Sequence, residues 1–413
     1  MVIRVCCFVC MVLVAVHARA QYKTLDYYVN AGIESSPLLK DYAGLVQLNR
    51  IDSARIAAGY KTQVNGVSSN SWSPVIGGWG YDGVITNYGN FSQLVAASKQ
   101  LVGKANIKNQ YAALSLQSDS VKALAKISLK DLEKAITSQY ITAYGSWQQY
   151  QFNNEVYNLL QKEDTLLKKL AQSAVYRQTD YLTFLVTLQQ QKLSVLQARN
   201  QYKNDYATLS YVSGIIDTSF APIAPPGIEL YSMTEPENTV FYDKFRVDSL
   251  LLKNTDAQID FNYKPKVNLY ADGGYVSSFM YQAYKNFGTS FGVNLTVPIY
   301  DGKQRKMQHT KVAIAEQTRQ GYRDFFKTQY SQQIAQLTQQ LNATGELIDE
   351  TTAQLKYVES LIQANSKLLA TGDVRIADYI IAINNYLNAK NIILQNTITK
   401  LQIISQINYW SKQ

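Results

Sequence analysis

The charged groups with the most regular spacing in this sequence lie in two copies of the pattern Arg-x-x-Asp-Tyr. The copies occupy residues 177–181 and 375–379, 198 positions apart. Their aspartates, Asp180 and Asp378, each stand just before an apolar run of helical period, where a carboxylate can cap the first turn of a helix. The arginine of each copy can satisfy carbonyl groups at the end of a preceding helix. One interpretation of both copies is therefore helix-turn chemistry.

Groups suited to catalysis or metal binding are scarce. His309 is the only histidine after residue 20, and all three cysteines lie within the first 20 residues, at positions 6, 7 and 10. The sequence contains no nucleophile–base pair, phosphate-binding loop or cluster of metal-ligand type. We therefore expect no enzymatic activity, no cofactor and no metal site, and we expect His309 to be a solvated helix residue.

The two copies belong to a tandem duplication of the chain, because the same 198-residue offset continues beyond them without a gap. The matching residues are Lys192 with Lys390, Leu196 with Leu394, and Gln197 with Gln395. A repeat of this length is far longer than a solenoid unit. We expect a first structural repeat over residues 21–214, a proline-rich linker over 215–238 and a second repeat over 239–413.

The first 20 residues have the pattern of a signal peptide. Arg4 precedes an apolar run over residues 5–16, and Ala-Arg-Ala ends at Ala20 before Gln21. Such a small-x-small ending predicts cleavage between Ala20 and Gln21, and hence export of the mature chain. The formal net charge of +9 falls to +7 without Arg4 and Arg19. Lysines and arginines are not clustered as in a nucleic-acid-binding protein, so we expect no nucleic-acid partner.

Long helices are predicted where proline is absent, over residues 75–221 and 299–413. Apolar residues there recur at spacings of three, four or seven, as in a coiled coil. The clearest series is Phe326, Tyr330, Ile334, Leu337, Leu341, Ile348, Leu355, Val358, Ile362 and Leu369. We predict long helices over residues 104–174 and 303–371, each about 100 Å long, and shorter ones over 37–59 and 179–212. The many tyrosines are expected to pack between helices with their hydroxyls reaching water.

Four strands are predicted between the short and the long helices. Residues 266–275 and 290–300 alternate apolar with small or polar side chains, and about ten such residues suffice for a tilted strand to cross a membrane. Residues 61–72 and 83–98 alternate poorly and are predicted from the repeat. Aromatic residues that flank the turns are candidates for a membrane-interface belt: Trp72, Trp79, Tyr81, Phe279, Tyr281 and Tyr284.

Four strands cannot close a barrel, and an open sheet edge is not viable in lipid. A membrane location therefore requires several copies of the chain to share one barrel. Two chains would give eight strands and three would give twelve. Only the larger barrel leaves a path for a solute. The predicted fold is mixed and mainly α, with a long coiled-coil helical barrel and a β-barrel shared between protomers.

Three short motifs resemble those of the TolC-like outer-membrane efflux and secretion channels. Residues 263–267 read Tyr-Lys-Pro-Lys-Val, residues 297–302 read Val-Pro-Ile-Tyr-Asp-Gly, and residues 369–372 read Leu-Ala-Thr-Gly. Their order, spacing and duplication cover essentially the whole chain after residue 20. The resemblance implies a homotrimer with a twelve-stranded barrel in outer-membrane lipid and a helical tunnel in the periplasm. It also implies docking to a periplasmic adaptor and an inner-membrane transporter.

In that family an aspartate six residues after the glycine at the helix break lines the periplasmic aperture. Here Asp378 follows Gly372 by six residues, and Asp180 follows Ala174 by six in the first repeat. Three Asp378 carboxylates in a narrow ring would attract cations.

The resemblance also implies that Asp180 bonds to a neighbouring helix pair, with Arg375 and Tyr379 as the nearest candidates. Arg177 is the first-repeat counterpart of Arg375. The sequence departs from the family pattern at three positions, because the usual gate arginine, further aspartate and tyrosine fall on Val374, Ile381 and Leu369.

The function indicated by these features is that of a passive outer-membrane exit duct in a tripartite efflux system. A channel for type I protein secretion uses the same duct, and the sequence does not separate the two. A trimeric coiled-coil surface protein would explain the helices, but it would not need the duplicated strands or the helix break.

Overall fold

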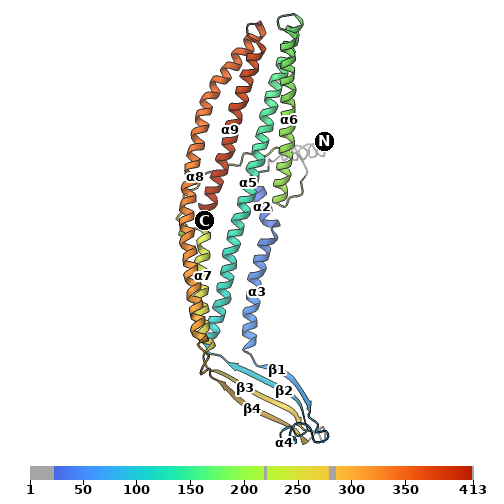
Figure 1. The fold of residues 1–413 in the computed structure, drawn as a ribbon, viewed down its shortest axis with the longest axis vertical. Helices are drawn as coiled ribbons and strands as arrows, with labels where there is room; N and C mark the ends of the chain where they lie inside the picture. Colours follow the sequence, from blue (N-terminus) through green and yellow to red (C-terminus); the bar gives the residue numbers. More distant parts are fainter. Residues whose placement is uncertain (1–22, 218–220, 279–284, 412–413) are drawn as a thin grey trace, which may run out of the picture. The chain divides into compact units, whose positions relative to one another are not determined.

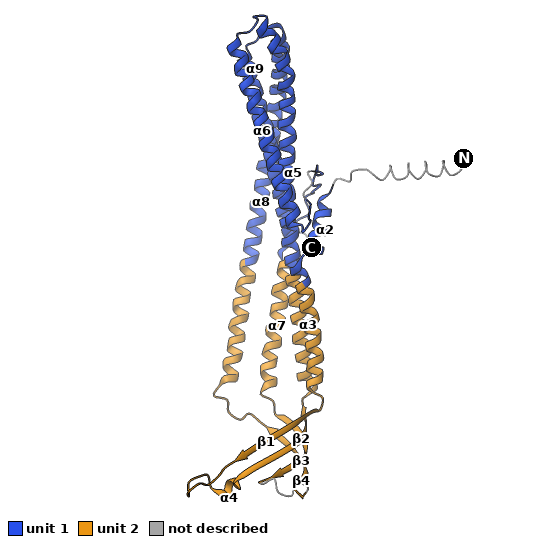
Figure 2. Ribbon diagram, turned by 90° about the vertical axis from the view of Figure 1, so that its right-hand side faces the viewer, with its two compact units in different colours: residues 1–40, 126–240, 326–413 blue, residues 41–125, 241–325 orange. Residues whose placement is uncertain are grey.

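The computed structural model describes residues 23–217, 221–278 and 285–411. The predicted signal peptide with Ala20 and Gln21, and the aromatic residues Phe279, Tyr281 and Tyr284, lie outside these ranges. The chain divides into two compact units, drawn in blue and orange in Figure 2. Unit 1 contains residues up to 40, 126–240 and 326–413, and unit 2 contains residues 41–125 and 241–325.

The order of elements along the chain is nearly the same in the two sequence halves (Figure 1). The elements are α2 (Leu25–Ser35), α3 (Pro37–Gly59), β1 (Gln63–Trp72), α4 (Gly83–Thr86), β2 (Gly89–Leu101), α5 (Lys104–Gln172), α6 (Gln178–Val212), the 3-10 helix η1 (Pro236–Asn238), α7 (Val240–Asn262), β3 (Lys266–Ser277), β4 (Phe287–Thr296), α8 (Gln304–Thr371) and α9 (Ile376–Ser411). The four predicted helices are α3, α5, α6 and α8, each within two residues of its predicted bounds. The four predicted strands are also present.

Both bounds of β2 and both bounds of β4 were predicted wrongly by three or more residues. Strand β2 ends at Leu101 rather than at position 98, and β4 begins at Phe287 rather than at position 290. Strand β2 begins at Gly89 rather than at position 83, because Asp82 caps the one-turn helix α4 through a 2.9 Å bond from the Val84 N–H to its carboxylate. Strand β4 ends at Thr296 rather than at position 300. Pro298 follows two residues later, and proline has no N–H to donate to a strand ladder.

The sheet lies in unit 2 and is antiparallel, with the order β1-β2-β3-β4. Pairing between β3 and β4 places Val267 opposite Leu295 and Leu269 opposite Val293, so these side chains share one face. We call this the apolar face, and its other members on β3 and β4 include Ala271, Phe287 and Phe291. The opposite face of the same strands carries Lys266, Asn268, Asp272, Ser290, Asn294 and Thr296. Strands β1 and β4 are the two edges of the sheet, and all ten residues of β1 are exposed.

Helices α5, α6, α8 and α9 run side by side in unit 1 (Figures 1 and 2). Their shared core includes Leu167 from α5, Phe184 from α6, Leu369 from α8 and Ile383 from α9, all fully buried. The predicted apolar series on α8 is confirmed, because all ten of its members are buried or half-buried. Both sequence repeats thus contribute two helices to one core.

The segment between the repeats packs along unit 1 without regular structure over residues 221–235. Asn408 of α9 donates to the Glu229 carbonyl at 2.6 Å and accepts from the Tyr231 N–H at 2.9 Å. The Tyr140 hydroxyl donates to the Ala224 carbonyl at 2.8 Å, and that of Tyr202 bonds the Ala221 carbonyl. Tyrosines therefore pack between helices as expected, but these hydroxyls bind backbone carbonyls rather than reach water.

Candidate functional site

The two Arg-x-x-Asp-Tyr copies follow the two helix-to-helix turns of unit 1, between α5 and α6 and between α8 and α9. The arginine of each copy ends its turn, and the other four residues lie in the first turn of α6 or α9. Both long helices end in the same way. The Val175 N–H donates to the Leu170 carbonyl and the Asp373 N–H to the Leu368 carbonyl, each at 3.0 Å. These bonds span five residues and mark a Schellman motif, whose C′ residue takes the left-handed conformation. That residue is Ala174 in the first turn (φ 59°) and Gly372 in the second (φ 81°).

The two turns pack against each other, which explains the glycine in the second. A Cβ at Gly372 would lie 2.8 Å from Cγ1 of Val175, closer than real Cβ atoms come to another heavy atom. Glycine also adopts a positive φ without the steric cost that alanine meets. Ala174 adopts the same conformation with a side chain, so the first turn is held at some conformational cost.

Tyr176 joins the two turns through its hydroxyl, a role that no sequence pattern indicated. The hydroxyl oxygen lies 2.8 Å from the Val374 carbonyl oxygen and 3.1 Å from that of Leu369, and the side chain is buried. Burial, with a smaller contribution from Asp373, raises the pKa of Tyr176 and keeps the proton on the phenol. The repeat alignment places Tyr176 opposite Val374, so the duplicated pattern gave no signal for this bond.

Arg375 and Asp378 form a bidentate ion pair within one turn. Nε and Nη2 of Arg375 each donate to a different carboxylate oxygen of Asp378 at 2.9 Å. This hydrogen bond, assisted by the negative charge of Asp378, raises the pKa of the Arg375 guanidinium. Arg375 is 83% exposed and Asp378 36% exposed, so the pair is open to solvent and contributes little to stability.

The aspartates do not cap these helices, and in this respect the prediction was wrong. Helix α6 begins at Gln178 and α9 at Ile376, so Asp180 and Asp378 occupy the third helical position. The residue before each helix accepts the first helical bond, because the Asp180 N–H donates to the Arg177 carbonyl at 3.1 Å and the Asp378 N–H to that of Arg375 at 3.0 Å. A carboxylate in the first turn still interacts favourably with the helix dipole.

The expected partners of Asp180 are engaged elsewhere within one chain. Arg375 binds Asp378, and Tyr379 is fully buried in the unit 1 core. Burial raises the pKa of Tyr379, and its hydroxyl is one of the buried groups with no hydrogen-bond partner among the described residues. Arg177 and Asp180 are both exposed on the first turn. A link from Asp180 to Arg375 or Tyr379 of another protomer stays a prediction.

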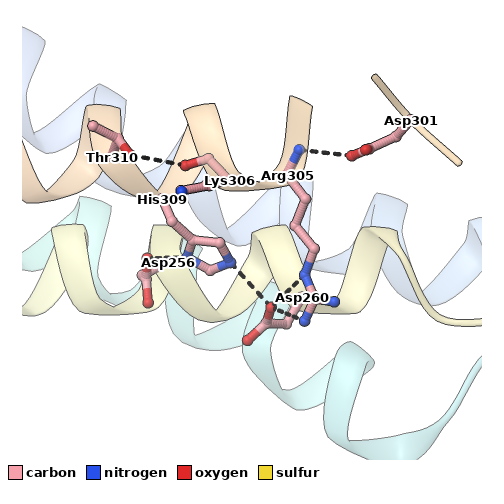
Figure 3. A network of polar contacts seen from close by, with 7 residues as sticks. All are labelled: Asp256, Asp260, Asp301, Arg305, Lys306, His309 and Thr310. Atoms are coloured by element: carbon pink, nitrogen blue, oxygen red, sulfur yellow. Dashed lines mark hydrogen bonds and ion pairs between the residues drawn. The ribbon is translucent and has the colours of Figure 1, made fainter. Parts of the chain in front are cut away.

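A second cluster of charged groups lies in unit 2, between α7 and α8 (Figure 3). His309 is half-buried there, with Nδ1 2.6 Å from an Asp256 oxygen and Nε2 3.1 Å from an Asp260 oxygen. His309 lies on a helix and stays partly exposed, as expected, but it is also bonded to two carboxylates, which was not expected. The carboxylates come from α7, and the sequence pattern did not indicate that α7 lies beside α8.

The described residues offer neither a metal centre nor a membrane-spanning helix. In the part of the chain that the structure describes, no group of three or more His, Cys, Asp or Glu side chains could hold a metal ion. Among those same residues, no helix has the length and apolar character needed to cross a bilayer.

Comparison of the whole fold with solved structures gives extensive matches at low sequence identity. CusC, whose structures concern folding and transmembrane channel formation, superposes with a TM-score of 0.76 and 12% identity, over 95% of this chain and 93% of that chain. The outer-membrane protein VceC of Vibrio cholerae superposes with a TM-score of 0.74 and 14% identity, over 95% of this chain and 97% of that chain. The MtrE outer-membrane channel of Neisseria gonorrhoeae, in an open state, superposes with a TM-score of 0.74 and 12% identity, over 94% of this chain and 88% of that chain. The chain has the TolC-like fold.

The TolC-like fold predicted from the sequence is thus confirmed over nearly the whole chain. By sequence, no family model matches and no curated protein is significantly similar. Because sequence identity is this low, the three-dimensional match establishes the architecture of helices and strands alone.

Proposed function

We propose that the chain forms the outer-membrane exit duct of a tripartite efflux system. It is a passive homotrimer rather than an enzyme, with the sheet in outer-membrane lipid and the helices in the periplasm. The observation that carries this proposal is the match of 94–95% of the chain to outer-membrane channels of the same fold.

The sheet supports the trimer. One chain presents two edge strands, β1 and β4, and an apolar face on β3 and β4. Strand edges in lipid must be paired because unsatisfied backbone groups are costly there. Pairing β4 of each chain with β1 of the next closes a twelve-stranded barrel from three chains. A purely structural coiled-coil protein would have no use for such a sheet.

The turns of unit 1 supply the periplasmic end of the duct. Three copies of Asp378 around the axis form the aperture, and three copies of Arg375 partly neutralise it through the ion pair within each chain. The exposed residues of the first turn and the start of α6, which include Val175, Leu182 and Val186, form the contact surface for the adaptor. The inner-membrane transporter supplies the energy for export.

Cross-linking of the proposed strand pair tests the trimer. The chain after residue 20 has no cysteine, so introduced cysteines report only the chosen contact. Cysteine at Val67 of β1 is combined in turn with cysteine at each residue of β4 on the same chain. At one register, oxidation should give a ladder of cross-linked chains that ends at three. As the control, cysteine at Leu269 of the inner strand β3 takes the place of the β4 cysteine. A ladder ending at two chains, or cross-linking equal to the control at every register, would contradict the proposal.

A further inference from the structure

The carboxylates of Asp256 and Asp260 face His309 from one side of α7, one helical turn apart. Each ring nitrogen of His309 lies against one of them, at 2.6 Å and 3.1 Å (Figure 3). Asp260 also accepts two bonds from Arg305 of α8, at 3.2 Å from Nε and 2.7 Å from Nη2. The imidazole thus links two helices through two carboxylates at once.

Only the protonated ring can make both bonds. A carboxylate accepts and does not donate, and neutral imidazole carries one N–H, so a neutral ring would turn a lone pair towards one carboxylate. The imidazolium has two N–H groups and a positive charge that both carboxylates stabilise. The contact geometry therefore selects the charged form of His309.

The groups packed around this link leave His309 as the titrating member near neutral pH. The hydrogen bond from Arg305, on the same helix, is the main cause that lowers the pKa of Asp260, and arginine side chains in proteins stay charged. The Asp301 carboxylate, which precedes α8, accepts a hydrogen bond from the backbone N–H of Arg305 at 2.7 Å. Helix α5 contributes the uncharged Asn109, which binds Asn254 and Gln258 of α7.

The other polar links between α7 and α8 do not titrate in this range. Arg319 donates to the Phe245 carbonyl at 3.0 Å and pairs with Glu316, whose pKa this hydrogen bond lowers to about 2. These links hold at both acidic and alkaline pH. Asp248 of α7 also interacts with Arg319 of α8, and burial raises its pKa above the ordinary 3.8, so it can add a pH dependence on the acidic side. A change in the contact between α7 and α8 above neutral pH is assigned to His309.

We propose that His309 is a proton-operated clasp that ties α7 to α8 next to the sheet when protonated and loosens this contact when the ring loses its proton. The Arg305–Asp260 ion pair and the Arg319–Phe245 bond persist in both states. The Asp256 hydrogen bond is the main cause that raises the pKa of His309 above the ordinary 6.5, and burial opposes it. A raised pKa in the folded state means that the stabilisation is fully present below pH 6.5 and is lost as pH rises through the folded pKa. This inference does not rest on the proposed function, because the clasp lies within one chain.

Titration by NMR tests the clasp directly. His309 is the only histidine after residue 20, so the mature protein labelled with isotope on histidine gives one imidazole signal that needs no assignment. We expect a pKa above 6.5, a lower value in Asp256→Asn and in Asp260→Asn, and little change in the control Asp243→Asn on the same helix. A wild-type pKa at or below 6.5, or a value that Asp256→Asn leaves unchanged, would overturn the proposal.

A distance measurement tests the mechanical consequence. Spin labels are attached to cysteines at the exposed Lys253 of α7 and Gln308 of α8, and labelled chains are diluted with unlabelled ones. The distance distribution should be narrow at pH 5 and broader at pH 9, whereas the His309→Gln variant should give the same distribution at both. Identical distributions in the wild-type protein at pH 5 and pH 9 would refute the loosening of the contact between α7 and α8.

Discussion

Exchanging the residues at the two left-handed positions should change the stability of the turns in opposite directions. In Gly372→Ala, the new side chain must adopt a φ of 81° and its Cβ meets Cγ1 of Val175 at 2.8 Å. In Ala174→Gly, a residue already at φ 59° loses its side chain. A Cβ added at the helical Gly345 would have no neighbouring side chain within 4 Å among the described residues, so Gly345→Ala is a matched control for adding one methyl group.

The expected magnitudes follow from these contacts. A left-handed alanine costs roughly 1–2 kcal/mol, and moving Val175 off its rotamer adds roughly 0.5–1.5 kcal/mol. Alanine also restricts the unfolded chain, which offsets about 0.4–1 kcal/mol of this cost, so Gly372→Ala should destabilise its turn by about 2 kcal/mol. Ala174→Gly removes the cost of a left-handed alanine but adds conformational freedom to the unfolded chain. The net effect should be an increase of about 0.5–1 kcal/mol in the stability of the first turn. Gly345→Ala should stabilise α8 by about 0.5–1 kcal/mol.

Hydrogen exchange of peptides that cover the two turns measures these local effects, because exchange there reports local opening. At about 1.4 kcal/mol per factor of ten, Gly372→Ala should speed exchange over residues 365–380 by about 30-fold. Ala174→Gly should slow exchange over residues 168–182 by about 2-fold to 5-fold. Unchanged exchange in Gly372→Ala would refute the packing of the two turns, and faster exchange in Ala174→Gly would refute the cost assigned to the left-handed alanine.

Three further predictions concern the turns and the sheet. Tyr176→Phe removes the one hydroxyl hydrogen that the Val374 and Leu369 carbonyls share and should lower the local stability by roughly 1 kcal/mol, seen as faster exchange in both turns. Exchange equal to that of the wild-type protein would show that the hydroxyl does not link the turns. Asp378→Asn should weaken cation selectivity in bilayer recordings, whereas Arg375→Gln should strengthen it by freeing the carboxylate, and no change in either would place the pair away from the aperture. Val293→Arg on the apolar face should destabilise the assembled barrel by roughly 2–4 kcal/mol, while the neighbouring Asn294→Arg on the opposite face should assemble. If Asn294→Arg failed and Val293→Arg assembled, the apolar face would not be the face towards lipid.

The helices and strands could be predicted from sequence because their signals are local and duplicated. Stretches without proline and an apolar series at heptad spacing gave the bounds of α5 and α8 within two residues. The weaker strands β1 and β2 were predicted only from the repeat, and the start of β2 was misplaced because the cap of α4 by Asp82 lies in a loop sequence with poor alternation.

The contacts of the candidate site were less predictable, because they join residues far apart in the sequence. The Tyr176 bond crosses 193 and 198 residues to Leu369 and Val374, and the His309 contacts require α7 beside α8. A pattern such as Arg-x-x-Asp places an arginine and an aspartate near each other but does not say whether the aspartate caps the helix or pairs with the arginine. Backbone geometry decides this, and it put the aspartates at the third helical position.

Single-channel recording of the mature protein purified in detergent, combined with its mass in detergent, tests the central claim most directly. The exit-duct account predicts a particle of three chains that inserts into a planar bilayer and gives discrete openings with a preference for cations. A stable particle that remains in water without detergent and gives no conductance would contradict the account.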